Sequence, residues 1–299
     1  MLCCLLHLVV ASHALLGLLL IVTPSWLLSF TVEGEYKSLH LLMQSYVGVF
    51  HLAVAAFVFH QGEGKQPRPF VFARALSAFF VLFTKLFAAW HLSEKSTRGL
   101  LISDDFVWSS LLLDGAWLGA EVVRFLRSED SDEDKINDLC AVTTRWAEGK
   151  GSRYLENALY ADAAIAFAYA LFHFAFPTNI LKLVIRSNIE LDSHHYMWCR
   201  LFGALWLQPA LTSFAAVHSV SHHQLSHLLS RLVIQVGLFT LHVWGHWIDP
   251  VYSINHISAF MVAGFFMSFH ISLFYRFFKL YQHEPKTRVS ARVEIKKTK

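Results

Sequence analysis

The sequence predicts an all-α membrane protein of eight transmembrane helices, arranged as two parallel repeats of four helices each. Three observations support this fold class. The chain contains eight apolar stretches, each about long enough to cross a bilayer, for which a helix needs roughly 20 residues. Apolar residues make up 55% of the 299 residues and charged residues only 16%, whereas a soluble domain has about a quarter. Finally, a set of landmarks recurs in the same order in both halves.

The predicted spans follow one another with short polar connections. Inside a bilayer every backbone polar group must be bonded within its own segment, so each span is expected to be a helix. In the first half, residues 1–127, the spans are 2–22, 39–59, 70–90 and 106–125. A polar acidic linker, residues 128–153, separates it from the second half, residues 154–281, whose spans are 156–176, 196–217, 228–247 and 254–275. A basic tail, residues 282–299, ends the chain.

The landmarks indicate that the halves are duplicates. The matching pairs are Thr23-Pro24 with Phe176-Pro177, Gly48 with Gly203, Arg74 with Arg231, Phe83-Thr84 with Phe239-Thr240, and Trp90 with Trp244. The first span can also be interpreted as a signal peptide, but no basic segment precedes it, and the repeat makes it the counterpart of the fifth span. Because each half has an even number of spans, both halves point the same way, as in parallel-repeat transporters.

Basic residues are distributed unevenly between the two sides of the predicted membrane. With both chain ends on one side, that side and its membrane ends hold 18 of the 25 Lys and Arg residues, and the opposite loops hold six. Lys and Arg accumulate on the cytosolic side of membrane proteins, and Trp gathers at membrane boundaries. Six tryptophans lie near the opposite boundary. We therefore expect both termini in the cytosol.

The chain ends in Lys296-Lys297-Thr298-Lys299. Lysines at the third and fourth positions from a cytosolic carboxyl end resemble the dilysine retrieval signal of endoplasmic reticulum membrane proteins. The alternative is a basic tail attracted to anionic lipid. We predict a multi-pass protein of the endoplasmic reticulum membrane, with the lipid bilayer and the coat-protein retrieval machinery as partners and no nucleic-acid partner.

Ionisable and helix-breaking residues inside the spans are candidates for transport or for helix packing. A charged side chain at the centre of a span costs roughly 2.5–3.5 kcal/mol on insertion scales, so such residues usually have a role. Lys85 and Asp114 can pair across adjacent helices, and Asp162 lies within the fifth span. Gln208-Pro209 removes one helical hydrogen bond and is expected to kink or unwind the sixth span. The alternatives are a proton or substrate relay and an ion pair that fixes helix packing.

Eighteen histidines invite a metal hypothesis. His242, His246 and His256 flank one short loop that also contains Asp249. Three imidazoles and a carboxylate can form a tetrahedral zinc site. The sequence favours a set of interfacial histidines over this site, so no cofactor is predicted and zinc is the alternative. The spacing argues against a di-iron centre that also uses His218 and its neighbours, because about 20 helical residues, or roughly 30 Å, separate the two histidine groups.

The start of the second half carries a resemblance to known proteins. Phe176-Pro177 ends one span, and Arg200-Leu201-Phe202-Gly203-Ala204-Leu205 opens the next. This order resembles DoxX-like proteins and a tumour-suppressor-inducible four-span protein of the endoplasmic reticulum, here as a tandem duplication. The resemblance covers spans five to seven and concerns packing residues, so it implies a four-helix fold and carries over no catalytic residue.

No catalytic motif accompanies these features. The chain has no GxSxG sequence, no P-loop and no glycine-rich dinucleotide signature. The sequence therefore favours a regulatory or interaction protein without enzymatic activity. The alternatives are a secondary transporter of a small solute or lipid, and a metal-dependent membrane enzyme.

Overall fold

The computed structural model describes residues 2–33, 36–62, 66–94, 101–102, 104–128, 151–217, 219 and 221–283. Long helices dominate this part of the chain: α1 Leu2–Val22, α3 Ser38–Gln61, α4 Arg68–Glu94, α5 Asp104–Arg127, α7 Gly151–Ala175, α9 Ser193–Val217, α10 Ser221–Val243 and α11 His256–His283. Two short helices, α2 Pro24–Thr31 and α8 Pro177–Val184, follow α1 and α7, and a π-helical turn, η1 Trp244–Ile248, extends α10. Strands β1 Val32–Glu33 and β2 Leu101–Ile102 pair antiparallel.

The all-α prediction is confirmed, because every predicted span coincides with one of the long helices. Within the described residues, five segments are long and apolar enough to cross a membrane: Ser38–Gln61, Arg68–Trp90, Tyr154–Ala175, His222–Ile248 and His256–Lys279. The bent pair formed by α1 and α2 is a sixth if it is counted as one span. The chain is thus built as a helical membrane protein.

Helices α5 and α9 do not qualify as spans by composition. Helix α5 contains Asp114, Glu121 and Arg124 in addition to its charged ends. Helix α9 begins with two histidines and includes Arg200 and several hydroxyl and amide side chains. The polarity of α9 has a physical reason, because this helix lies at the centre of the bundle and packs on α3, α4, α7 and α10. A helix that is surrounded by protein can carry polar side chains that would be costly against lipid.

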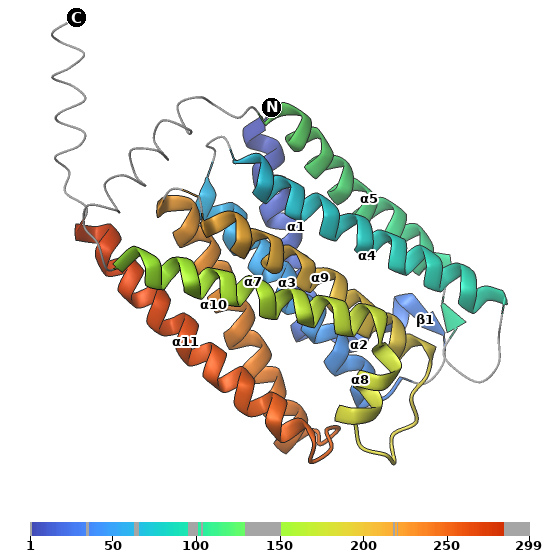
Figure 1. The fold of residues 1–299 in the computed structure, drawn as a ribbon. Helices are drawn as coiled ribbons and strands as arrows, with labels where there is room; N and C mark the ends of the chain where they lie inside the picture. The colour runs from blue at the N-terminus through green and yellow to red at the C-terminus, as the bar shows by residue number, and fades with distance from the viewer. Residues whose placement is uncertain are drawn as a thin grey trace, which may run out of the picture.

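The helices are arranged around α3 and α9, which contact each other in the middle (Figure 1). Helix α1 packs on α3, and α7 packs on α9. Helix α4 also packs on α9, whereas α10 packs on α3. Helices α5 and α11 lie outermost, on α4 and α10 respectively. Helix α1 begins, and α11 ends, at the same end of the bundle.

Two helix pairs approach closely at small residues. An added Cβ on Gly17 would lie 2.8 Å from the Gly48 carbonyl oxygen, where α1 crosses α3. An added Cβ on Gly203 would lie 2.6 Å from the Phe174 backbone nitrogen and 2.9 Å from the Ala170 carbonyl oxygen, where α9 crosses α7. Small residues at a crossing allow the backbones of membrane helices to come this close.

Proline ends α1 and α7 but does not break α9. Helices α1 and α2 meet at an angle of 102° at Thr23-Pro24, and α8 begins at Pro177. In contrast, α9 runs from Ser193 to Val217 through Pro209. The helix is therefore not unwound at Gln208-Pro209, and the alternative expectation of a kink there stays a prediction. The Thr212 hydroxyl donates to the Pro209 carbonyl oxygen, and packing on α3, α4, α7 and α10 holds the helix together.

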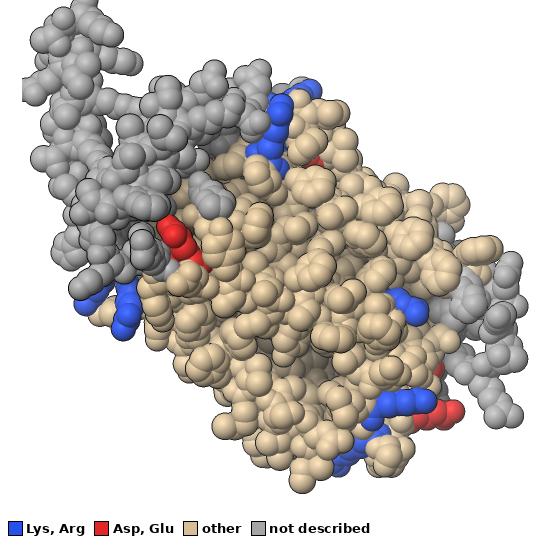
Figure 2. Space-filling model, in the orientation of Figure 1, with Lys and Arg blue, Asp and Glu red and all other residues tan. Residues whose placement is uncertain are grey.

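The surface agrees with a membrane setting. Figure 2 shows that charged side chains on this face gather toward the two ends of the helices and leave a broad band without them between. Large apolar side chains such as Phe79, Phe83, Met261 and Phe265 are exposed on the outer helices. Exposed apolar side chains are unfavourable in water, whereas the hydrocarbon core of a bilayer accommodates them.

Candidate functional site

A cavity of about 420 Å³ lies in the second half, between α7, α9, α10 and α11, with α3 and α8 also contributing. Small-molecule sites usually measure about 300–1,000 Å³, so this volume suits a compact or single-chain ligand. Most of the lining is apolar and includes Met43, Ile165, Phe172, Leu238, Val262 and Phe266.

Helix α10 presents one face to the cavity. Arg231, Gln235, Leu238 and His242 follow one another at helical spacing and all line it. The Arg231 charge is neutralised by a partner on α7, as shown below. Gln235 is only 4% exposed, and among the described residues its carboxamide has no hydrogen-bond partner. The polar groups of the cavity therefore lie mainly along α10.

A tyrosine–histidine cluster forms part of the cavity wall. The Tyr46 Oη lies 2.6 Å from His242 Nδ1 and 2.5 Å from Tyr252 Oη. The Tyr252 ring stacks on the His256 ring, with centroids 3.7 Å apart, and His256 Nδ1 lies 2.8 Å from His246 Nε2. Tyr46 has one proton, so donating it to His242 leaves its oxygen free to accept from Tyr252. The cluster thus joins α3, α10 and the loop before α11.

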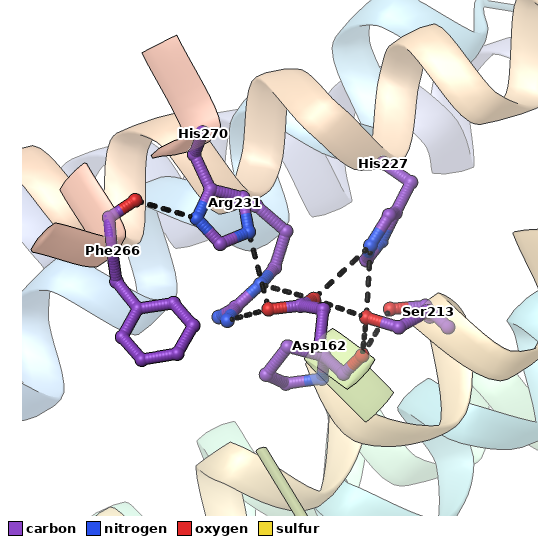
Figure 3. A network of polar contacts seen from close by, with 8 residues as sticks. Asp162, Ser213, His227, Arg231, Phe266 and His270 are labelled. Carbon is purple, nitrogen blue, oxygen red and sulfur yellow. Dashed lines mark hydrogen bonds and ion pairs between the residues drawn. The ribbon is translucent and has the colours of Figure 1, made fainter. Parts of the chain in front are cut away.

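A second polar cluster, the network around Asp162, adjoins the cavity through Arg231 (Figure 3). The Arg231 Nη2 and Nε donate to its two carboxylate oxygens at 2.5 and 2.8 Å. The Ser213 hydroxyl donates to Asp162 Oδ2 at 2.5 Å, and His270 Nε2 lies 3.1 Å from Oδ1. His227 Nε2 lies 3.0 Å from the Ser213 hydroxyl. Asp162 is 2% exposed, so its charge is compensated almost entirely inside the protein and ties α7 to α9, α10 and α11.

The cavity opens toward the bilayer between α7 and α11. Phe172 on α7 is 50% exposed and Val262 on α11 is 41% exposed, although both line the cavity. Figure 1 shows the two helices meeting at one end and diverging toward the other. At the first end the Arg276 guanidinium lies over the Tyr154 ring. At the other end the backbone N–H of Ser253 donates to the Val184 carbonyl oxygen. The opening between α7 and α11 therefore lies between these two points of contact.

The first half contains ion pairs of its own. Lys85 Nζ lies 2.5 Å from Asp114 Oδ2, so the predicted pairing of these two residues is confirmed. Sequence reasoning missed a second pair, in which Arg74 Nε and Nη2 donate to the Glu121 carboxylate at 2.9 and 3.0 Å, both residues being fully buried. These contacts join α4 to α5. Lys85, Asp114 and Asp162 are thus each held by a partner on another helix, which favours the packing interpretation over a relay.

The predicted zinc residues come together only in part. His242, His246 and His256 are neighbours, with ring centroids of His256 4.7 and 4.8 Å from those of His242 and His246. Asp249 has no contact with them among the described interactions. The Tyr46 hydroxyl bonds His242 Nδ1, which leaves only Nε2 of this ring for a metal, and His256 Nδ1 lies 2.8 Å from His246 Nε2. The donor set therefore does not form the tetrahedral centre that the sequence suggested.

A different group meets the distance criterion for a metal. The potential ligand atoms of His40, Asp192 and His195 lie within 4.8 Å of one another, a geometry found for no other set among the described residues. However, the backbone N–H groups of Lys37 and Asp192 donate to Nδ1 of His40 and His195, each at 3.0 Å. Because a backbone N–H always carries its proton, the neutral His40 ring must hold its own proton on Nε2, whereas His195 Nδ1 also lies 2.9 Å from Asp192 Oδ1 and can donate to that oxygen instead.

This tautomer disfavours a metal and favours a hydrogen-bonded helix cap. His40 Nε2 donates to Asp192 Oδ2 at 2.9 Å, so the atom that a metal needs carries a proton. Asp192 Oδ1 accepts from the backbone N–H groups of His194 and His195 and caps the start of α9. Burial raises the pKa of Asp192, but contacts with His195 and His40 lower it more, so its net pKa lies well below the usual value.

Some predicted residues lie outside the part of the chain that the structure describes. These are the retrieval lysines Lys296 and Lys297, most of the linker 128–153, and His218. Sequence reasoning did not predict that four residues would line a cavity or join its polar networks: Tyr46, Tyr252, Gln235 and Arg231. An arginine within an otherwise apolar helix, at the depth of Asp162, was the one available signal for the network.

Comparison with known proteins identifies the family. No curated protein and no solved structure matches the chain significantly. The family described as "Domain of unknown function (DUF8292)" matches residues 8–277, which include all the helices of the cavity. The chain belongs to this family.

Proposed function

We propose that this protein is a membrane-embedded binding protein that takes a lipid-like amphiphile from the bilayer into the cavity of its second half. The observation that carries the proposal is the cavity itself, which is lined from both α7 and α11 and reaches the lipid-facing surface between them. A lipid can enter sideways without leaving the hydrocarbon.

The lining supports an amphiphile over a small polar solute. Apolar side chains cover most of the wall, and a few polar groups are placed along α10 and at the tyrosine–histidine cluster. This combination is typical of ligand pockets, in which apolar contact supplies affinity and a few polar groups fix orientation. A partner protein could then bind the lipid-bound and lipid-free forms differently, in line with the regulatory function that the sequence favours.

Photolabelling tests the proposal directly. Protein reconstituted in phosphatidylcholine nanodiscs is irradiated with a long-chain fatty alcohol that carries a diazirine and an alkyne. We expect labelled peptides from residues 165–173 of α7 and 259–266 of α11. Ala263, which lines the cavity, is changed to Phe to fill it, and labelling should fall severalfold.

The matched control places the same aromatic side chain on the outer surface. Met261 lies on α11 as well but is 65% exposed, so Met261→Phe should leave labelling unchanged. Equal labelling of the wild type and the Ala263→Phe variant, at equal thermal stability, would show that the probe binds elsewhere. Labelling spread evenly over all lipid-facing helices would lead to the same conclusion.

We further propose that the two halves are a tandem repeat of eight spans, with DoxX-like four-span proteins as the model for one half. The packing order supports this, since α1 with α3, and α4 with α5, have counterparts in α7 with α9, and α10 with α11. The close crossings at Gly48 and Gly203, and the backbone-to-histidine bonds at His40 and His195, also fall at matching places. A glycosylation-site scan of the loops tests the span number.

We propose that the protein resides in the endoplasmic reticulum membrane, with both termini in the cytosol. The excess of Lys and Arg on one side and the Lys296-Lys297 pair support it. Changing both lysines to serine should move a tagged protein beyond the reticulum if coat-protein retrieval holds it there. A reticular distribution that stays the same would leave residence to another signal and remove the proposed partner.

A further inference from the structure

We propose that the cavity ligand is an uncharged lipid alcohol whose hydroxyl is held by His173, His242 and Gln235. This inference rests on the proposed function and names the chemical class of its ligand. All three side chains line the cavity, the first on α7 and the other two on α10. Each has hydrogen-bonding capacity that no other described residue takes up.

His173 supplies an acceptor. Its Nδ1 lies 2.8 Å from the Tyr169 carbonyl oxygen, and a carbonyl can only accept, so the Nδ1 carries the proton. The neutral ring then has a lone pair on Nε2. The ring is fixed by stacking on Tyr169, with centroids 5.5 Å apart, and by the edge of Phe202 at 4.9 Å. The acceptor is therefore held in place before any ligand binds.

We assign His242 as a donor. The Tyr46 hydroxyl, 2.6 Å away, can give its proton to His242 Nδ1 while it accepts from Tyr252, and the ring then carries its own proton on Nε2. Gln235 offers both functions, since its carboxamide has an acceptor oxygen and a donor nitrogen. A buried polar group without a partner is unfavourable, and the cavity contains an acceptor, a donor and a group that is both. A hydroxyl, which donates once and accepts twice, matches this set.

Charged head groups match it poorly. The cavity wall contains the cationic side chain of Arg231, whose Nε and Nη2 both donate to the Asp162 carboxylate. A carboxylate or phosphate would find no uncompensated positive charge among the described lining residues, and burying an unpaired ion is costly. An ammonium group would leave the donors of His242 and Gln235 without an acceptor. The volume of about 420 Å³ also suits one chain or a compact ring system better than a two-chain phospholipid.

Competition against the photolabel tests the chemical class. The competitors share one chain and differ at its end: hexadecan-1-ol, hexadecane and ionised hexadecanoate, each expressed as its mole fraction in the nanodisc. One additional hydrogen bond is worth roughly a threefold to tenfold gain in affinity, so the alcohol should displace the label that much better than the alkane. Hexadecanoate should displace it less well than the alcohol. Cholesterol and cholestane, run in parallel, show whether rings are accepted.

The variants separate the hydroxyl contact from the cavity. Gln235→Met and His173→Phe keep size and remove hydrogen bonding, so each should reduce the advantage of the alcohol over the alkane without weakening the alkane. Gln208 is also buried but does not line the cavity, and Gln208→Met is the matched control that should keep the full advantage. If one of the two cavity variants fails to fold, the other still decides.

The outcomes distinguish this inference from the proposed function. Equal displacement by alcohol and alkane in the wild type would overturn the lipid-alcohol inference while leaving the cavity as a lipid site. Strongest displacement by hexadecanoate would overturn it in favour of an anionic lipid. No displacement by any competitor, together with unchanged labelling in Ala263→Phe, would instead overturn the proposed function.

Discussion

Replacing Asp162 by asparagine removes the central charge of the network that joins α7 to α9, α10 and α11. The change keeps the shape of the side chain but leaves the buried Arg231 guanidinium without its counter-charge. Removing one partner of a buried ion pair typically costs about 3–5 kcal/mol. At about 4 kcal/mol the unfolding equilibrium shifts by roughly a thousandfold. Because both residues are no more than 2% exposed, water cannot solvate the unpaired charge and so reduce the loss of stability.

The assay is equilibrium unfolding in mixed micelles, followed by tryptophan fluorescence. The cycle Asp162→Leu, Arg231→Met and the double variant measures the coupling between the two residues. We expect the double variant to be more stable than either single one, since no charge then remains unpaired. Ser213→Ala, which removes one hydrogen bond but keeps the ion pair, should cost less, about 1.5–3 kcal/mol.

The first half offers an independent comparison. Glu121→Gln leaves Arg74 unpaired in the same way, and both side chains are 0% exposed, so a loss of similar size is expected. The reasoning is refuted if the Asp162 variant is as stable as the wild type. It is also refuted if the loss in the double variant equals the sum of the single losses, because the two groups would then be uncoupled.

Three further predictions concern stability. Gly203→Ala should destabilise by about 1–3 kcal/mol, because the new Cβ meets the backbone of α7, whereas Gly115→Ala, with open space around it, should be neutral or slightly stabilising; unfolding titrations compare the two. Tyr46→Phe should cost about 1–3 kcal/mol by leaving the His242 Nδ1 acceptor unsatisfied, and a stability equal to that of the wild type would contradict the bond. Asp192→Ala should cost about 0.5–2 kcal/mol at neutral pH through loss of the helix cap. Since the pKa of Asp192 is lowered in the fold, its contribution is full above about pH 4 and falls as the pH drops toward the folded-state pKa, so the difference between variant and wild type should shrink on acidification; a difference that grows would contradict the assignment.

The positions of the helices were predictable because hydropathy and length are local properties. Each predicted span lies within a few residues of a helix, and the Lys85–Asp114 pair followed from the shared depth of two costly charges. The partner of Asp162 did not follow. Arg231 was noted only as a landmark at the start of a span, and nothing in a linear pattern says which face of α10 meets α7.

The cavity and the histidine contacts depend on packing, which sequence spacing does not determine. Tyr46 and Tyr252 are 206 positions apart, yet their hydroxyls share a hydrogen bond. The zinc hypothesis grouped residues by proximity along the chain and so included Asp249, while the aspartate that does meet two histidines, Asp192, precedes α9 and bonds a residue on α3. The unwinding expected at Pro209 failed because neighbouring helices enclose α9, which a proline in isolation does not reveal.

Helices α9 and α11 differ in how many neighbouring helices they contact, and this difference should determine how fast the sequence of each diverges among related proteins. Helix α9 has a neighbour on every flank, so an exchange at any turn must be answered by a compensating exchange on another helix. Helix α11 packs mainly on α10, and outward positions such as Met261 and Phe265 are exposed on the protein surface. Related chains should therefore diverge fastest along the outer side of α11, with one greasy residue replacing another, while α9 changes slowly and in concert with its neighbours.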